Sequence, residues 1–269
     1  MQPSLDVIIP CYNAAVTLET AVQSALMQAE VQNVWLVDDA STDNTRDVMV
    51  ALAAQYPQVH TEYLAQNGGA AKARNWGALQ SQADLIAFLD ADDEYEPQVL
   101  AAAYMALAQF PYIGMVRLKC RPIGFPAHYL QHADFAQTWQ RLEMTVGGNM
   151  VCRRSIFLAA GGFPQDALFR QFGGEDAALG IAFTRSSVVG TLFGEHDAAV
   201  RHIYRQGIHA ERLLDSALYG KSIDGLTEAR RQQAEAVTDN ICCRLAEVRA
   251  HGAFEQSGIM ALTTTYQNQ

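Results

Sequence analysis

The sequence has no long hydrophobic run. Its longest apolar stretch covers residues 99–108, which is about half of the roughly 20 residues that a membrane-spanning helix needs. The apolar stretch at residues 7–10 is too short for the core of a signal peptide and has no basic flank. We therefore expect no transmembrane segment, and a location in the cytoplasm or at the periphery of a membrane.

Basic residues and cysteines are also scarce. Lys and Arg number 19 against 29 Asp and Glu, which gives a net charge of −10, and an acidic chain binds a phosphate backbone poorly. Nucleic acid is therefore not an expected partner. The five cysteines are odd in number and form no C-x-x-C pair, so we expect them to be reduced and free of metal.

Several motifs of common enzyme classes are missing. A dinucleotide-binding loop would place G-x-G-x-x-G after the first strand, where residues 10–15 read PCYNAA. The zinc peptidase motif H-E-x-x-H and the serine hydrolase motif G-x-S-x-G do not occur. Residues 220–222 resemble the end of a phosphate-binding loop, but Asp215 stands in the place of that motif's first glycine. The sequence thus argues against dehydrogenases and these two hydrolase classes.

The first 120 residues alternate between short apolar runs and helical patterns. Strands are expected at residues 5–10, 33–37, 59–64, 85–89 and 113–118, and helices at 15–29, 44–55, 70–83 and 98–110. Such alternation predicts an α/β fold with a Rossmann-like, mostly parallel sheet flanked by helices. Residues 122–140 are predicted to be an irregular excursion that could touch substrate, and residues 227–250 one long charged helix.

Carboxylates follow the fourth predicted strand. Residues 90–94 read DADDE, directly after a fully apolar run. Residues two apart in an extended chain point the same way, so Asp90 and Asp92 can converge at the carboxyl edge of the sheet, where ligands of such sheets bind. A divalent cation held with phosphate oxygens would relieve their repulsion. The alternative is an acidic loop that caps the helix beginning near Pro97.

Three further segments carry polar side chains at predicted element ends. Asp38 and Asp39 end the second strand, where one carboxylate could accept the N–H of a uracil-like base, and residues 41–43 can cap the next helix. Residues 67–75 combine two glycines, which permit close backbone approach, with cations that could face phosphate. Glu175 and Asp176 follow two glycines and are either first-turn acids of a helix or include a general base.

These segments, in this order, resemble the inverting family 2 glycosyltransferases of the GT-A fold. The resemblance covers roughly residues 5–205. It rests on residues 7–13 (VIIPCYN), 37–43 (VDDASTD), 67–69 with 74–75, 88–93 (FLDADD), 148–154, 161–163 and 174–176. It implies a catalytic domain at 1–210, with a nucleotide-binding half at 1–120 and an acceptor half at 121–210, followed by a C-terminal helical extension at 211–269.

The resemblance also implies roles for single residues. Asp90 and Asp92 would be the D-x-D pair that holds Mn²⁺ or Mg²⁺ on the donor diphosphate, with Asp92 the direct ligand and His209 or His202 a further one. Asp176 would remove the proton of the acceptor hydroxyl, with Glu175 beside it. The implied nucleotide-binding residues are Pro10, Tyr12, Asn13, Asp39, Asn67, Lys72, Arg74 and Asp90, among which Tyr12 lies against the base and Asp39 accepts its N–H.

The implied reaction is a single in-line displacement with inversion. A nucleoside-diphosphate sugar, with a UDP-sugar favoured, would donate to a saccharide, lipid-linked or protein acceptor. Relatives often show Arg-Leu where Ala182 and Phe183 stand here, so we expect the acceptor side to differ. Two alternatives stay open: a non-catalytic nucleotide-sugar binder, and an aspartate-nucleophile phosphatase, in which the first Asp of a D-x-D pair attacks phosphorus.

Overall fold

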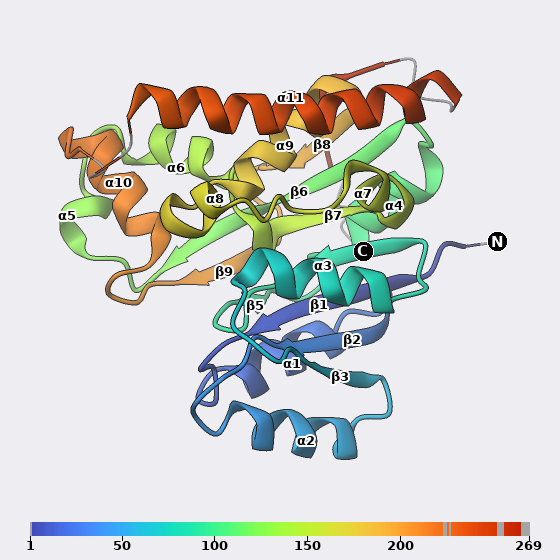
Figure 1. The fold of residues 1–269 in the computed structure, drawn as a ribbon. Helices are drawn as coiled ribbons and strands as arrows, with labels where there is room; N and C mark the ends of the chain where they lie inside the picture. Colours follow the sequence, from blue (N-terminus) through green and yellow to red (C-terminus); the bar gives the residue numbers. More distant parts are fainter. Residues whose placement is uncertain (1, 223–224, 226, 252–255, 265–269) are drawn as a thin grey trace.

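The computed structural model describes residues 2–222, 225, 227–251 and 256–264. The amino-terminal half alternates strands and helices (Figure 1). Its elements are β1 (Leu5–Cys11), α1 (Leu18–Leu26), β2 (Val31–Asp38), α2 (Thr45–Gln55), β3 (Val59–Tyr63), α3 (Ala70–Gln80) and β4 (Leu85–Phe88). β1 lies between β2 and β4, β3 pairs with β2, and all of these pairs are parallel. The four strands thus bring their carboxyl ends to one edge of the sheet.

The second half extends the same sheet. Its elements are β5 (Glu94–Tyr95), α4 (Ala101–Gln109), β6 (Ile113–Ile123), α5 (Ala127–Leu130), α6 (Phe135–Glu143), the 3₁₀ turn η1 (Gly147–Asn149), β7 (Met150–Arg153), α7 (Arg154–Ala160), α8 (Ala167–Phe172), α9 (Glu175–Ser186), β8 (Val188–Leu192), β9 (Ala199–Ile203), α10 (His209–Tyr219), α11 (Glu228–His251) and β10 (Gly258–Ala261). β7 joins the halves because it pairs antiparallel with both β4 and β6. β8 and β9 run parallel to β6, and β10 runs parallel to β8.

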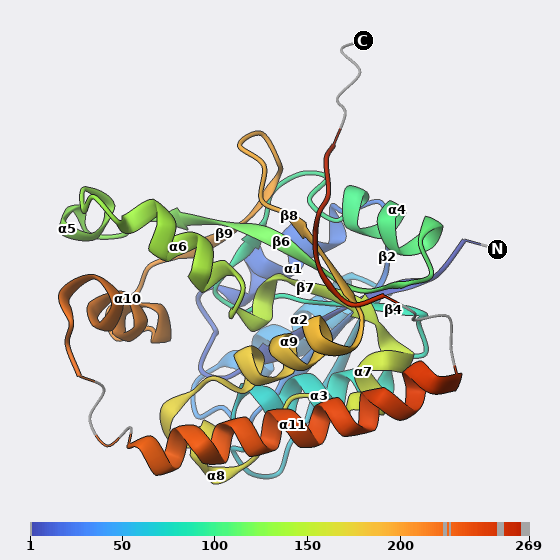
Figure 2. The same cartoon turned by 90° about the horizontal axis from the view of Figure 1, so that it is seen from above.

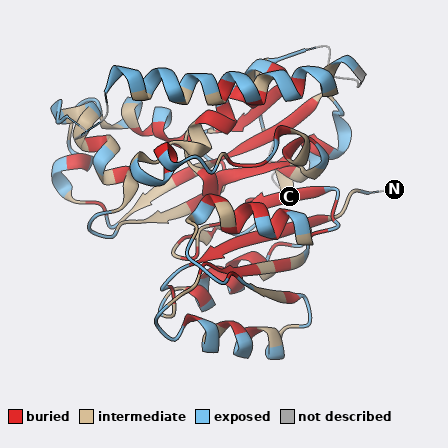
Figure 3. Cartoon of the chain, in the orientation of Figure 1, coloured by how far each residue is buried: buried red, intermediate tan, exposed pale blue. Residues whose placement is uncertain are grey.

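Two hydrophobic layers cover the two faces of the sheet. Successive residues of a strand point to opposite faces, and in β1 the side chains of Val7 and Ile9 join one cluster while Ile8 joins the other. α1 and α4 pack on the first face, and α3, α7 and α9 on the second, where α11 lies lengthwise over α7 and α9 (Figure 2). The central strands β1, β4 and β8 are buried, β3, β9 and β10 are only partly buried, and the outer helix surfaces are exposed (Figure 3). The predicted α/β fold with a mostly parallel sheet is confirmed.

The prediction that residues 122–140 form an irregular segment is wrong for most of that segment. α5 and α6 lie there, and β6 extends through Pro122 to pair with β9. α6 has only nine residues, which is too short for a clear helical period. It is fixed by tertiary contacts, since Trp139 and Leu142 are buried and the Trp139 indole N–H donates to the carbonyl of Cys120.

The carboxyl-terminal segment contains the expected long helix, α11, and one further element. β10 adds a strand of four residues to the edge of the sheet beside β8. None of the helices in the described part of the chain combines the length and the apolar character needed to cross a membrane.

Candidate active site

The carboxyl edge of the sheet opens into two adjoining cavities. The larger has a volume of about 380 Å³ and contains the side chains of Glu175, Asp176 and His209 in its lining. The smaller, of about 210 Å³, is lined by Pro10, Tyr12 and Arg205 among others. The two linings share Ala70, Arg74, Asp90 and Asp92. The two carboxylates after β4 therefore lie where the cavities meet.

Several residues expected to bind nucleotide form hydrogen bonds within the loops near the smaller cavity. Both carboxylate oxygens of Asp39 accept hydrogen bonds of 2.7 Å, from the backbone N–H groups of Gly68 and Gly69. The side-chain amide of Asn67 donates to the carbonyl of Asp39, and the Asn13 side chain accepts from the N–H of Thr42. These bonds fix the glycine-rich loop that precedes α3 beside the loop that follows β2.

Among the predicted nucleotide-binding residues, four line neither of these two cavities: Asn13, Asp39, Asn67 and Lys72. Tyr12 does line the smaller one and is 52% exposed at its rim, so its ring has a free face. Lys72 lies with its side chain over Gly68, where an added Cβ would meet Lys72 Cδ at 2.1 Å. A side chain at position 68 would therefore require the Lys72 side chain to move.

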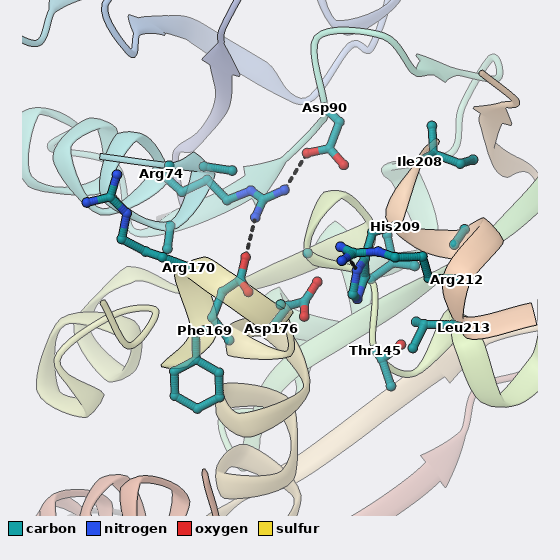
Figure 4. Close-up of a pocket in the computed structure, with 18 of the residues that line it drawn as sticks. Arg74, Asp90, Thr145, Phe169, Arg170, Asp176, Ile208, His209, Arg212 and Leu213 are labelled. Atoms are coloured by element: carbon teal, nitrogen blue, oxygen red, sulfur yellow. Dashed lines mark hydrogen bonds and ion pairs between the residues drawn. The ribbon is translucent and has the colours of Figure 1, made fainter. Parts of the chain in front are cut away.

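Arg74 connects the two groups of acids. It rises from α3 and contacts Asp90, and its Nη1 lies 4.0 Å from Oε1 of Glu175 (Figure 4). Burial opposes the charge of this guanidinium, but Asp90, Glu175 and Asp176 outweigh burial and raise the pKa of Arg74. A permanent cation thus stands between the D-x-D pair and the first turn of α9.

Asp92 is paired with Arg205, which lies in the turn between β9 and α10. The Arg205 side chain is 49% exposed, whereas that of Arg74 is 6% exposed. Sequence reasoning assigned no role to Arg205, because the pairing with Asp92 joins residues that are far apart in the chain. The ion pair at Asp92 is therefore the more open of the two.

Glu175 and Asp176 form the first turn of α9, where the helix dipole favours negative charge. Gly173 and Gly174 precede them with φ of 74° and 96°, and a Cβ at Gly173 would meet the His209 ring at 2.5 Å. Burial and the neighbouring Asp176 raise the pKa of Glu175 to about 6, although Arg74 opposes this. Both acids line the larger cavity.

The two candidate histidines occupy different positions in the larger cavity. Nδ1 of His209 lies 3.0 Å from the Arg212 guanidinium (Figure 4), and burial lowers its pKa. Nδ1 of His202 lies 2.7 Å from Asp93, while its Nε2 is buried and finds no hydrogen-bond partner among the described residues. A histidine held by a carboxylate through one nitrogen commonly binds metal through the other.

A metal site is not fully assembled in the described ranges, since no three His, Cys, Asp or Glu side chains there come close enough to hold one ion together. The donor set nevertheless suits a hard divalent cation, because two carboxylates, one bare imidazole nitrogen and the oxygens of a bound diphosphate are typical ligands. Asp90, Asp92 and His202 or His209 are the residues that would hold it.

The wall opposite α3 is built by the segment from Leu142 to Asn149. Glu143 is 4% exposed, and its carboxylate accepts the N–H of Cys120. Asn149 donates to the carbonyls of Leu118 and Glu143. Leu142, Thr145 and Gly147 of this segment line the larger cavity, so these bonds hold one side of the site.

Replacing Glu143 by glutamine is expected to stabilise the protein more at pH 8 than at pH 5. Burial raises the pKa of Glu143 from 4.5 to about 7. The folded protein therefore binds the proton more tightly than the unfolded chain does, and stability falls as pH rises from about 4.5 to 7. Glutamine keeps an acceptor for Cys120 without the charge. Thermal unfolding of both proteins at pH 5 and pH 8 measures the change in stability. An equal change in Tm at the two pH values would contradict the prediction. Glu228→Gln at the exposed start of α11 is the control.

Comparison with known proteins shows the family of the chain. The fold and the paired acids define a glycosyltransferase of the GT-A type. Residues 6–164, more than half of the chain, match the family described as Glycosyl transferase family 2. The protein belongs to this family, which decides against the aspartate-nucleophile phosphatase.

Individual relatives are similar over shorter stretches. Over 100 residues the chain is 39% identical to the "Putative teichuronic acid biosynthesis glycosyltransferase TuaG" of Bacillus subtilis, a match covering 37% of this chain and 40% of that protein. Over 91 residues it is 38% identical to the succinoglycan biosynthesis protein ExoU of Rhizobium meliloti, covering 34% and 27%. The matches thus span two-fifths or less of the length of these relatives.

Solved structures share the fold. TarS of S. aureus in complex with UDP-GlcNAc has a TM-score of 0.60 at 18% identity, covering 90% of this chain and 71% of TarS. The mannosyltransferase PcManGT of Pyrobaculum calidifontis, in complex with GDP-Man and Mn²⁺, has a TM-score of 0.60 at 22% identity, covering 96% and 77%. The GT-A fold predicted from the sequence is confirmed.

Proposed function

We propose that the protein transfers a sugar from a nucleoside-diphosphate sugar to an acceptor hydroxyl, with metal dependence and with inversion at the anomeric carbon. The observation that carries this proposal is the position of Asp90 and Asp92 where the two cavities meet, with Glu175 and Asp176 in the larger cavity beyond them. A donor can lie across this junction, with its nucleoside in the smaller cavity and its sugar in the larger one.

The smaller cavity, of about 210 Å³, would hold the base of the donor. We take a UDP-sugar as the favoured donor. Tyr12 offers a free aromatic face at the rim for stacking. Asp39 lines neither cavity and already accepts two backbone N–H groups, so accepting the N–H of a uracil would use the second lone pair of a carboxylate oxygen.

In the larger cavity the acceptor oxygen attacks C1 of the sugar as the bond from C1 to the diphosphate oxygen breaks. Asp176 takes the proton of the acceptor hydroxyl, and the half-exposed Arg205 beside Asp92 is placed to contact the departing diphosphate. Mn²⁺ or Mg²⁺, held by Asp90 and Asp92, would supply positive charge to the diphosphate. Attack from the face opposite the diphosphate inverts the anomeric centre.

The acceptor half is assigned to residues 121–210 with one extension. The boundary at residue 210 falls inside α10, and Arg212 and Leu213 of that helix line the larger cavity. The segment 211–269 therefore contributes to the acceptor side. Ala182 and Phe183, which stand in the place of the Arg-Leu of many relatives, are fully buried. The cavity wall is formed instead by Thr145, Arg212 and Leu213. A saccharide, lipid-linked or protein acceptor would enter beside these three residues.

Incubation with UDP-, GDP- and dTDP-sugars in Mn²⁺ tests the proposal. Slow hydrolysis of one donor, with water in place of the acceptor, is expected, and a UDP-sugar is expected to be cleaved fastest. Binding of a nucleotide sugar without any turnover would indicate a non-catalytic binder. Faster hydrolysis of a GDP- or dTDP-sugar would reject the choice of base and leave the transferase intact.

A further inference from the structure

Arg117 on β6 is a fully buried cation. Its side chain has no exposed surface, and its Nη1 donates to the carbonyl of Val146 at 2.6 Å and to Oδ1 of Asn149 at 3.0 Å. Its Nε and Nη2 are buried and have no hydrogen-bond partner in the part of the chain that the structure describes. Two of its three nitrogens therefore make no hydrogen bond within the described residues.

A buried charge is costly unless an opposite charge or hydrogen bonds compensate it. Among the described residues, no carboxylate lies within 4.0 Å of a nitrogen of Arg117. Burial lowers the pKa of Arg117 to about 10, and the negative charge that most opposes this belongs to Asp176. The guanidinium thus stays charged at neutral pH, and its main counter-charge is an acid of the larger cavity.

The packing of α9 places this charge behind Asp176. A Cβ at Gly180 would lie 2.3 Å from Nη2 of Arg117, so the guanidinium rests directly against the bare backbone of Gly180. Asp176 precedes Gly180 by four residues, and residues four apart lie on one face of a helix, one turn from each other. Arg117 therefore lies against the side of α9 that carries Asp176.

The other charged groups around Asp176 are engaged elsewhere. Arg74 on α3 contacts Asp90 and lies 4.0 Å from Glu175. On α10, burial lowers the pKa of His209 and favours its neutral form, and the exposed Arg212 contacts that ring. Arg74 also keeps one unpartnered nitrogen, its Nε, but its guanidinium already pairs with Asp90, whereas Arg117 is a buried cation without an ion pair among the described residues.

We propose that Arg117 is a positioning residue for Asp176, and that its buried charge, seated against Gly180, holds the Asp176 carboxylate in place to receive the acceptor proton. The inference rests on the role of Asp176 in the proposed function. Without Arg117, the first turn of α9 would keep its two neighbouring acids, Glu175 and Asp176, with Arg74 alone to compensate them.

The test is a double-mutant cycle on the full chain, measured as hydrolysis of the preferred donor in Mn²⁺. Arg117→Met is expected to lower kcat about tenfold or more with donor KM changed less than about threefold, and Arg117→Lys to recover part of the loss. In an Asp176→Asn background, Arg117→Met is expected to lower kcat less than about twofold further, because the residue it serves is gone. Arg185→Met is the matched control: Arg185 lies on α9 but is exposed and bonded to Asp239, so kcat should not change.

If Arg117→Met lowers kcat by the same factor in both backgrounds, the proposal is overturned. Arg117 would then only stabilise the structure through its hydrogen bonds to Val146 and Asn149. If Arg117→Met does not fold, Gly180→Ala provides the second variant, since its methyl group displaces Nη2 without removing the charge. It is expected to lower kcat and not donor affinity, and an unchanged kcat would overturn the proposal. Failure of the proposed function is distinct, because it would appear as a wild-type protein that cleaves no nucleotide sugar.

Discussion

Asp176→Asn is expected to lower kcat about 10²- to 10⁴-fold, the usual contribution of a general base, while donor and metal binding stay intact. Asparagine keeps the size of the side chain and loses the proton acceptor. Asp176 sits in the first turn of α9 and lines the larger cavity, on the far side of Arg74 from Asp90. Donor turnover gives kcat, and calorimetry with UDP and Mn²⁺ measures binding separately.

The control for Asp176→Asn is Glu175→Gln, one residue away in the same turn. Glu175 lies 4.0 Å from Arg74, so we expect it to support the site rather than take the proton, and its replacement should cost less. A larger loss from Glu175→Gln would show that Glu175 is the base. If Asp176→Asn keeps its fold but loses metal binding, the residue belongs to the donor site instead.

The parts of the site that follow directly from a strand were predictable. Apolar runs bounded by acids mark β2 and β4, and parallel pairing then places Asp38, Asp39, Asp90 and Asp92 at one edge whatever the surrounding loops do. Local sequence also placed the acids of α9, because two glycines with positive φ mark the turn before a helix. These features depend on neighbours within a few residues.

The partners of those acids could not be predicted, because they come from distant parts of the chain. Arg205 meets Asp92 and His202 meets Asp93 only after β9 pairs with β5 and β6. Arg117 resembles an ordinary strand residue in sequence, and its place beneath α9 depends on β6, η1 and Gly180 together. The role of Arg74 at the nucleotide stays a prediction, and the sequence did not indicate that packing also places it between Asp90 and Glu175.

Asp92→Asn is expected to abolish the dependence of UDP affinity on Mn²⁺. Loss of a residue that only supports a metal ligand lowers metal affinity about 10- to 100-fold, so loss of a direct ligand should exceed that range. Asp92 is the better candidate because its partner Arg205 is half exposed and can be displaced, whereas Arg74 is buried against Asp90. Calorimetry of UDP binding with and without Mn²⁺ measures the effect. If Mn²⁺ still raises the affinity for UDP to the same extent, Asp92 is not a metal ligand. Asp134→Asn on the exposed surface is the control.

The same titration separates the two histidines. Nε2 of His202 is buried without a hydrogen-bond partner among the described residues, and Asp93 fixes the ring through Nδ1. The ring of His209 instead contacts Arg212 through Nδ1, and a cation beside an imidazole disfavours a metal ion there. His202→Ala should therefore weaken Mn²⁺-linked UDP binding more than His209→Ala does. The reverse order would assign the third ligand to His209.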